Sequence, residues 1–207
     1  MPVLYAAGTG YMDYLAVIFY TTIYQIMKVL TIVCLALGLT IGAQAQIKKA
    51  SLQAAGLTCA MCSNATLKSL QTLPFISKVD TDLDNTTFLL YFKPGAAVNV
   101  DQIQQKVDDA GFSVAKLVLT ADFDGLKVEK DSHVPYAGNT LHFVNVKDQE
   151  LKGETALTVI DKNFVTARQF KKYSAQTKMS CYQTGVMEDC CKPGGKQAAK
   201  RILHVTI

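Results

Sequence analysis

Two thiols carry the clearest chemistry in this chain. Cys59 and Cys62 stand three positions apart in the segment GLTCAMC, residues 56–62. An alternating apolar run precedes the segment and a helix-like pattern follows it, which predicts that the thiols lie on a strand-to-helix loop. A helix N-terminus favours the thiolate, the form of cysteine that binds metal. Thiolates select soft ions such as Cu(I), Zn(II) or their heavier relatives over Mg or Ca.

The spacing alone leaves other functions open for this pair. Two cysteines so placed also occur as a structural disulfide, as a redox couple of the thioredoxin kind, or as half of a four-cysteine zinc knuckle. A knuckle needs a second pair at suitable spacing. Cys181, Cys190 and Cys191 do not repeat the pattern.

The elements around the pair predict an α+β arrangement. Residues 49–55 alternate as a strand, and from Ser63 apolar residues recur at helical spacing until Pro74. The later pattern predicts strands over 75–83 and 86–92, a helix over 99–110 that ends at a glycine, and a last strand over 112–119. The order is βαββαβ, a ferredoxin-like antiparallel sheet with both helices on one face.

This order, with GLTCAMC in the first loop and Asp109-Ala110-Gly111-Phe112 after the second helix, resembles the heavy-metal-associated domain family. The resemblance covers residues 46–120. It implies that Cys59 and Cys62 bind the ion in near-linear coordination. It also implies that Leu57 anchors the loop into the core and that Phe112 packs beneath the loop.

The same resemblance favours one ion. Zinc-preferring members often have an acidic residue before the first cysteine, where this chain has Thr58. Mercury-binding members often have tyrosine at the position of Phe112. Cu(I) is therefore expected ahead of Hg(II) and Zn(II). The implied partners are a metal-transporting ATPase or another metal-binding protein.

The amino-terminal region predicts export. Residues 27–45 combine a basic start, a short apolar core and small residues at Ala43 and Ala45, as in a secretory signal cleaved after Ala45. Residues 1–26 are then expected to be a mis-called extension upstream of the true start at Met27. The expected location is periplasmic or secreted. The alternative is a membrane anchor that includes residues 14–26.

The second half predicts a small, mainly β domain. Residues 121–135 are polar and are expected to form a linker, and residues 136–207 the domain. Within it, strands are expected over 140–146, 154–160, 181–184 and 201–207, and a short helix over 164–175. Short strands with one helix suggest an OB-like barrel or a sandwich.

Three cysteines in this half form a second candidate group. A disulfide between Cys181 and either Cys190 or Cys191 suits a small exported domain, and a second thiolate site is the alternative. His204 is expected to lie near them. His133 and His142 are single histidines, for which a structural role is expected.

Several function classes find no support in the sequence. It contains no hydrolytic triad, no paired-carboxylate site and no nucleotide-binding loop, so an enzyme is not expected. The net charge of +4 is too small and dispersed to indicate nucleic-acid binding. The favoured function is capture, transfer or sequestration of a soft metal ion. The alternatives are an exported thiol-disulfide protein and a partner-binding module that acts through its carboxy-terminal domain.

Overall fold

A computed structural model describes residues 18–31, 46–57, 60–82, 85–187 and 200–207 of the chain. Residues 18–31 form a helix with exposed apolar side chains and belong to a separate unit. Among the described helices, none is both long and apolar enough to cross a membrane. The described residues from Gln46 onward form one compact unit.

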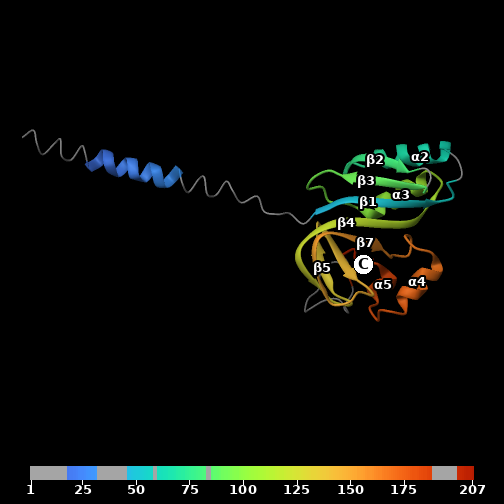
Figure 1. Ribbon diagram of the computed structural model, residues 1–207. Coiled ribbons are helices and arrows are strands. Elements are labelled where there is room, and N and C mark those ends of the chain that lie inside the picture. The colour runs from blue at the N-terminus through green and yellow to red at the C-terminus, as the bar shows by residue number, and fades with distance from the viewer. Residues whose placement is uncertain (1–17, 32–45, 58–59, 83–84, 188–199) are drawn as a thin grey trace, which may run out of the picture. The chain divides into compact units, whose positions relative to one another are not determined.

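The first half of this unit has the predicted ferredoxin-like order. Its elements are β1 (Gln46–Ala55), α2 (Ala60–Gln71), β2 (Ile76–Asp82), β3 (Thr87–Phe92), α3 (Val100–Asp109) and β4 (Ser113–Val128). The four strands lie in the order β2-β3-β1-β4, and every neighbouring pair is antiparallel. Figure 1 shows β1, β2 and β3 side by side with α2 and α3 near them.

Local sequence explains where these elements begin and end. Burial follows the alternating pattern of β1, which places Leu52 in the core and leaves Gln53 exposed. Asn99 caps α3, because its side chain accepts a hydrogen bond from the backbone N–H of Gln102. After α3, Gly111 adopts a left-handed backbone with φ of 87°, a conformation that favours glycine.

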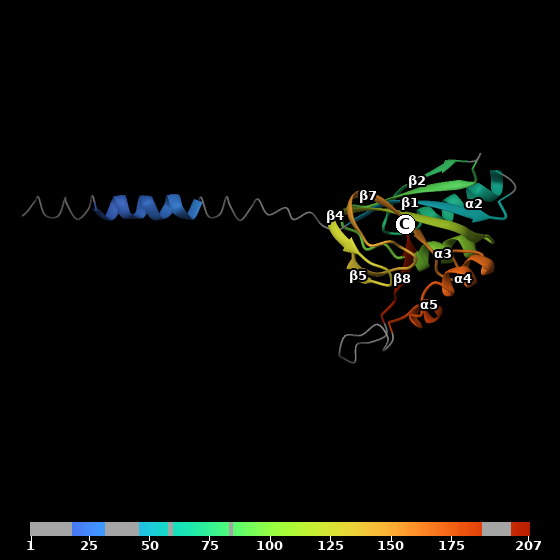
Figure 2. The same cartoon turned by 60° about the horizontal axis from the view of Figure 1, so that its bottom comes forward.

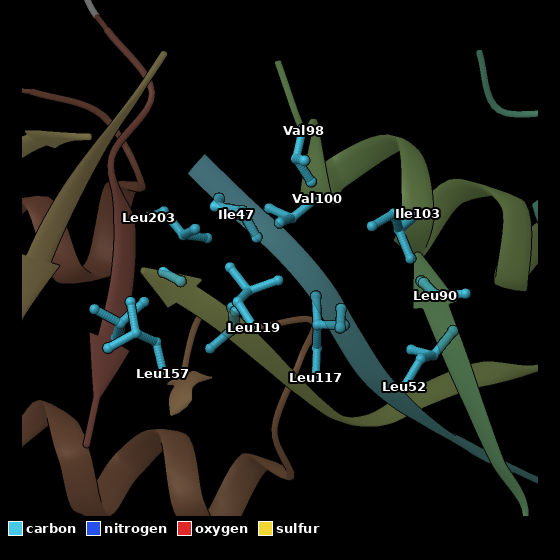
Figure 3. Close-up of a cluster of buried hydrophobic side chains, with 14 of the residues drawn as sticks. Ile47, Leu52, Leu90, Val98, Val100, Ile103, Leu117, Leu119, Leu157 and Leu203 are labelled. Carbon is cyan, nitrogen blue, oxygen red and sulfur yellow. The ribbon is translucent and has the colours of Figure 1, made fainter. Parts of the chain in front are cut away.

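The core lies between the sheet and the helices of this half. Leucines from three strands meet Ile103 of α3 in one cluster of buried side chains (Figure 3). Leu157 and Leu203 extend the cluster toward the carboxy-terminal half. One continuous core therefore serves both halves of the unit.

The second half adds four strands to the same sheet. Its elements are β5 (His133–Tyr136), β6 (Asn139–Phe143), β7 (Gln149–Val159), α4 (Ala167–Ser174), α5 (Cys181–Thr184) and β8 (Leu203–Thr206). The full order is β2-β3-β1-β4-β7-β8-β6-β5. All added pairs are antiparallel except β6 with β8, which run parallel.

The structure differs here from the sequence-based expectations. Residues 121–128, expected in a linker, continue β4 and pair with β7. Residues 181–184, expected as a strand, form the short helix α5, which ends at Gly185 with φ of 72°. An OB-like barrel is not confirmed, since the sheet has two different end strands, β2 and β5.

The sheet nevertheless curls strongly. β4 carries a bulge at Gly125, whose φ is 72°, and such bulges bend a strand. Tyr136 on the end strand β5 then reaches back to the middle of the sheet. Its hydroxyl accepts a hydrogen bond from the backbone N–H of Gln46 and donates to the carbonyl of Asp122.

A smaller apolar cluster lies under the last helices. Val144, Ile160 and Tyr182 are buried together, and Phe170 of α4 packs against them. The α4 and α5 helices lie next to each other in both views (Figures 1 and 2). The Tyr182 hydroxyl donates to the carbonyl of Ile160 over 2.8 Å, which fixes α5 against the end of β7.

Candidate functional site

The predicted thiol pair falls between the end of β1 and the first turn of α2. Thr58 and Cys59 lie outside the described residues. On the strand side, Leu57 packs against the core. On the helix side, Met61 is 84 % exposed and Cys62 is half-buried in the first turn of α2. The loop is therefore attached to the core at one end and open to solvent at the other.

Phe112 lies against the start of this loop. The pairing of Ala55 with Ser113 brings Gly56 opposite Phe112. Gly56 has φ of 87°, and a Cβ atom added to it would lie 3.5 Å from the Phe112 ring. Phe112 also packs against the core. This is the arrangement expected for a residue that supports the loop from below.

The first turn of α2 holds the backbone of Cys62. The Thr66 hydroxyl, which is fully buried, donates to the carbonyl of Cys62 over 3.2 Å. The Cys62 sulfur itself is disulfide-bonded. A sulfur in a disulfide is a poor ligand, so metal binding by Cys62 requires two electrons and two protons to reduce the bond to thiols.

Of the second candidate group, the structure describes only Cys181. Cys181 is a buried thiol at the start of α5. Cys190 and Cys191 lie outside the described residues, so the disulfide and the thiolate site predicted for the three cysteines both stay predictions.

The structure instead brings Cys181 together with histidines. Its Sγ atom lies beside the rings of His133 and His142. The sequence alone predicted only a structural role for these two histidines. The sequence did contain a signal for this grouping, because Leu141-His142-Phe143 and Leu203-His204-Val205 both set a histidine between buried apolar residues. In a strand, that pattern places the histidine on the face opposite the apolar neighbours.

Comparison with known proteins finds similarity in the first half of the sheet unit. The heavy-metal-associated domain family matches residues 51–113. The yeast copper transporter domain CCC2A, solved in apo and Cu(I)-loaded states, is 26% identical, over 31% of this chain and 88% of that one, with a TM-score of 0.29. CopA from Bacillus subtilis is 26% identical, over 33% of this chain and 90% of that one, with a TM-score of 0.30.

A third solved structure is similar as well. Oxidised MerP from Ralstonia metallidurans CH34 is 24% identical, over 33% of this chain and 97% of that one, with a TM-score of 0.30. No curated protein matches the sequence. These three solved structures each cover about a third of the chain.

Proposed function

Because residues 51–113 form a heavy-metal-associated domain, we propose that Cys59 and Cys62 bind one soft metal ion and that this ion is Cu(I). The observation that supports this most is the position of the pair: Cys62 lies in the first turn of α2, soon after Leu57, which packs against the core together with Phe112. Two thiolates suit a soft, low-coordinate ion.

The residues next to the pair favour Cu(I) over harder ions. Thr58 precedes Cys59, so no carboxylate adjoins the pair on that side. The first turn of α2 contains no acidic residue. A site with two sulfur ligands and no adjacent carboxylate suits Cu(I) or Hg(II) better than Zn(II), which usually takes four ligands.

Capture and transfer follow from thiol chemistry. When Cu(I) binds, each thiol loses its proton and the two sulfurs become ligands. An incoming thiolate of a partner then adds as a third ligand, and one original sulfur leaves and takes up a proton. Met61, exposed between the two cysteines, marks this loop as open to such a partner. A metal-transporting ATPase or another metal-binding protein fits this role.

Export belongs to the same proposal. Removal of residues 27–45 as a signal would leave a chain that starts at Gln46, the first residue of β1. The whole eight-stranded sheet would then remain intact. In an oxidising compartment, a reductant or prior metal loading has to keep the pair open, since disulfides persist there.

Competition for Cu(I) tests the proposal. The reduced protein is titrated anaerobically against a chromophoric Cu(I) chelator, together with the variants C59S and C62S. Each variant should bind Cu(I) several orders of magnitude more weakly, because one sulfur cannot replace two. The matched control is M61L, which changes the exposed thioether between the cysteines and should leave the affinity unchanged. Unchanged affinity in the C59S/C62S double variant would refute the site.

The disulfide at Cys62 supports a second candidate function, thiol-disulfide exchange. In that reaction a partner dithiol is oxidised and the Cys62 disulfide is reduced, with two electrons and two protons transferred. The fold favours it less, because α2 follows a strand of a ferredoxin-like sheet and not a thioredoxin-like βαβ unit. Stoichiometric oxidation of a partner dithiol by the metal-free, disulfide-bonded chain, lost in C62S, would favour this function.

A further inference from the structure

All three histidines of the chain stand in one row across the sheet. The chain contains three histidines. His133 on β5 pairs directly with His142 on β6, and His142 pairs directly with His204 on β8. Directly paired residues point to the same face of a sheet. We call His133, His142 and His204 the histidine row.

The histidine row lies on the face away from the main core. In β8, Leu203 and Val205 belong to the main core, so His204 between them points to the other face. His142 has the same relation to Leu141 and Phe143 in β6. Tyr182 of α5 covers this face and meets the His204 ring edge-on at 5.1 Å.

Cys181 of α5 completes the group. Its Sγ atom lies 3.5 Å from Nε2 of His133 and 3.7 Å from Nδ1 of His142. The three ligand atoms all lie within 4.8 Å of one another. The two imidazole rings are stacked with their centroids 4.2 Å apart. The ring of His204 follows, with its centroid 5.0 Å from that of His142.

These distances match those between ligands of a tetrahedral ion. A nitrogen at about 2.05 Å and a sulfur at about 2.3 Å from a zinc ion, at a tetrahedral angle, lie about 3.6 Å apart. The two observed nitrogen–sulfur distances, 3.5 and 3.7 Å, fall on either side of that value.

Carboxylates hold the outer nitrogens of two histidines. Nε2 of His142 lies 3.3 Å from Oδ1 of Asp131, which leaves Nδ1 facing the sulfur. Nδ1 of His204 lies 2.5 Å from Oδ1 of the buried Asp161. Metal-binding histidines usually have such a partner, which fixes the ring and raises its basicity.

The remaining nitrogen of His204 lacks a partner among the described residues. His204 is fully buried, and its Nε2 atom accepts or donates no hydrogen bond in that part of the chain. A buried polar atom without a partner costs about 1–3 kcal/mol, so such atoms are rare in the absence of a ligand.

Burial disfavours the charged form of two of these imidazoles. Burial, followed by the neighbouring His133 and His204, lowers the pKa of His142 to about 4, although Asp131 opposes the shift. Burial and His204 also lower the pKa of His133. His133 is only half-buried, so the group has an opening to solvent through which an ion could enter.

We propose that His133, His142 and Cys181 form a second metal site for a borderline-soft divalent ion of the Zn(II) class, with His204 beside them in the histidine row. Mixed nitrogen and sulfur ligands suit such an ion, whereas two thiolates suit Cu(I). Asp131 acts as the positioning residue for His142. The site is independent of Cys59 and Cys62, which lie on a different loop.

Cobalt binding tests this site separately from the first one. The full chain carrying C59S and C62S is reduced and titrated anaerobically with Co(II), a spectroscopic probe for tetrahedral zinc sites. We expect one Co(II) per chain, with visible bands of tetrahedral cobalt and a thiolate-to-cobalt charge-transfer band. Adding C181S should abolish the charge-transfer band.

Further variants keep the test decisive if C181S folds poorly. H133Q changes a half-buried residue at the opening and should weaken Co(II) binding at least tenfold, while the circular dichroism spectrum stays unchanged. D131N should weaken it about 10–100-fold, the usual effect of losing a carboxylate behind a ligand. The matched control is C190S/C191S, which should retain the charge-transfer band. No Co(II) uptake, a charge-transfer band that survives C181S, or a band that requires Cys190 and Cys191 would each overturn the assignment.

Discussion

Arg201 binds Asp101 of α3 through two charge-assisted hydrogen bonds. Its Nε and Nη2 atoms each lie 2.9 Å from one carboxylate oxygen of Asp101. Nη2 also donates to Asp161 over 2.8 Å, and the other oxygen of Asp161 contacts His204. A line of polar contacts therefore runs from α3, in the first half of the sheet unit, to the histidine row.

The Arg201–Asp101 pair should contribute modestly to stability. The two side chains are 37% and 48% exposed, so solvent screens their charges, but the pair is bidentate. In a double-mutant cycle with R201Q and D101N, we expect a coupling free energy of about 0.5–1 kcal/mol from chemical denaturation. The control cycle uses Lys78 and Asp80, a more exposed pair with a single contact. A coupling free energy no larger than in the control cycle would show that the bidentate geometry adds no measurable stability.

The two halves should unfold together because they share one sheet and one core. Leu119 is fully buried in β4, between its partners Ala50 in β1 and Leu157 in β7. L119A should cost about 2–5 kcal/mol of unfolding free energy. NMR signals from both halves should disappear at one denaturant concentration in each protein. The control L89A, at a position that is 39% exposed, should cost far less. Two separate transitions would contradict the single core.

Gly56 should affect two properties that can be measured separately, the stability of the fold and Cu(I) binding by the β1–α2 loop. Gly56 and Gly111 both have φ of 87°, but only at Gly56 would an added Cβ meet the Phe112 ring, at 3.5 Å. G56A and G111A should each lose about 1–2 kcal/mol of stability, the cost of a left-handed backbone in a residue with a side chain. Only G56A should also weaken Cu(I) binding, because Gly56 lies three positions before Cys59 and backbone strain there would shift the loop. Equal Cu(I) affinities in the two variants would contradict this expectation.

Mass spectrometry of the protein from its native host checks the export proposal. The mature chain should begin at or near Gln46, the first residue of β1. A mature form that still contains residues 1–26 would contradict both the signal assignment and the start at Met27.

Local patterns predicted the first half closely. Strand alternation, the Asn99 cap and Gly111 are features of neighbouring residues, and apart from the end of β4 the observed elements begin and end within a few positions of the expected ones. The prediction that the thiol pair falls between a strand and a helix used the same patterns. The family resemblance rested on residues that are contiguous in the sequence.

The second half depends on contacts that the sequence does not show locally. β4 continues past residue 120 because β7 pairs with it, and nothing near residue 120 marks that extension. The parallel pairing of β6 with β8 joins residues about sixty positions apart, and this pairing forms the histidine row. Residues 181–184 looked like a strand because of composition, whereas Gly185 and the Tyr182 contact to Ile160 stabilise a helical turn.

X-ray absorption at the copper edge tests the central claim most directly. The reduced C181S variant, which lacks the sulfur of the second site, is loaded with one equivalent of Cu(I) without added thiols. We predict a first shell of two sulfur atoms and no nitrogen, as expected for Cys59 and Cys62 alone. A shell that contains nitrogen, or a third sulfur, would contradict a two-thiolate site on the β1–α2 loop.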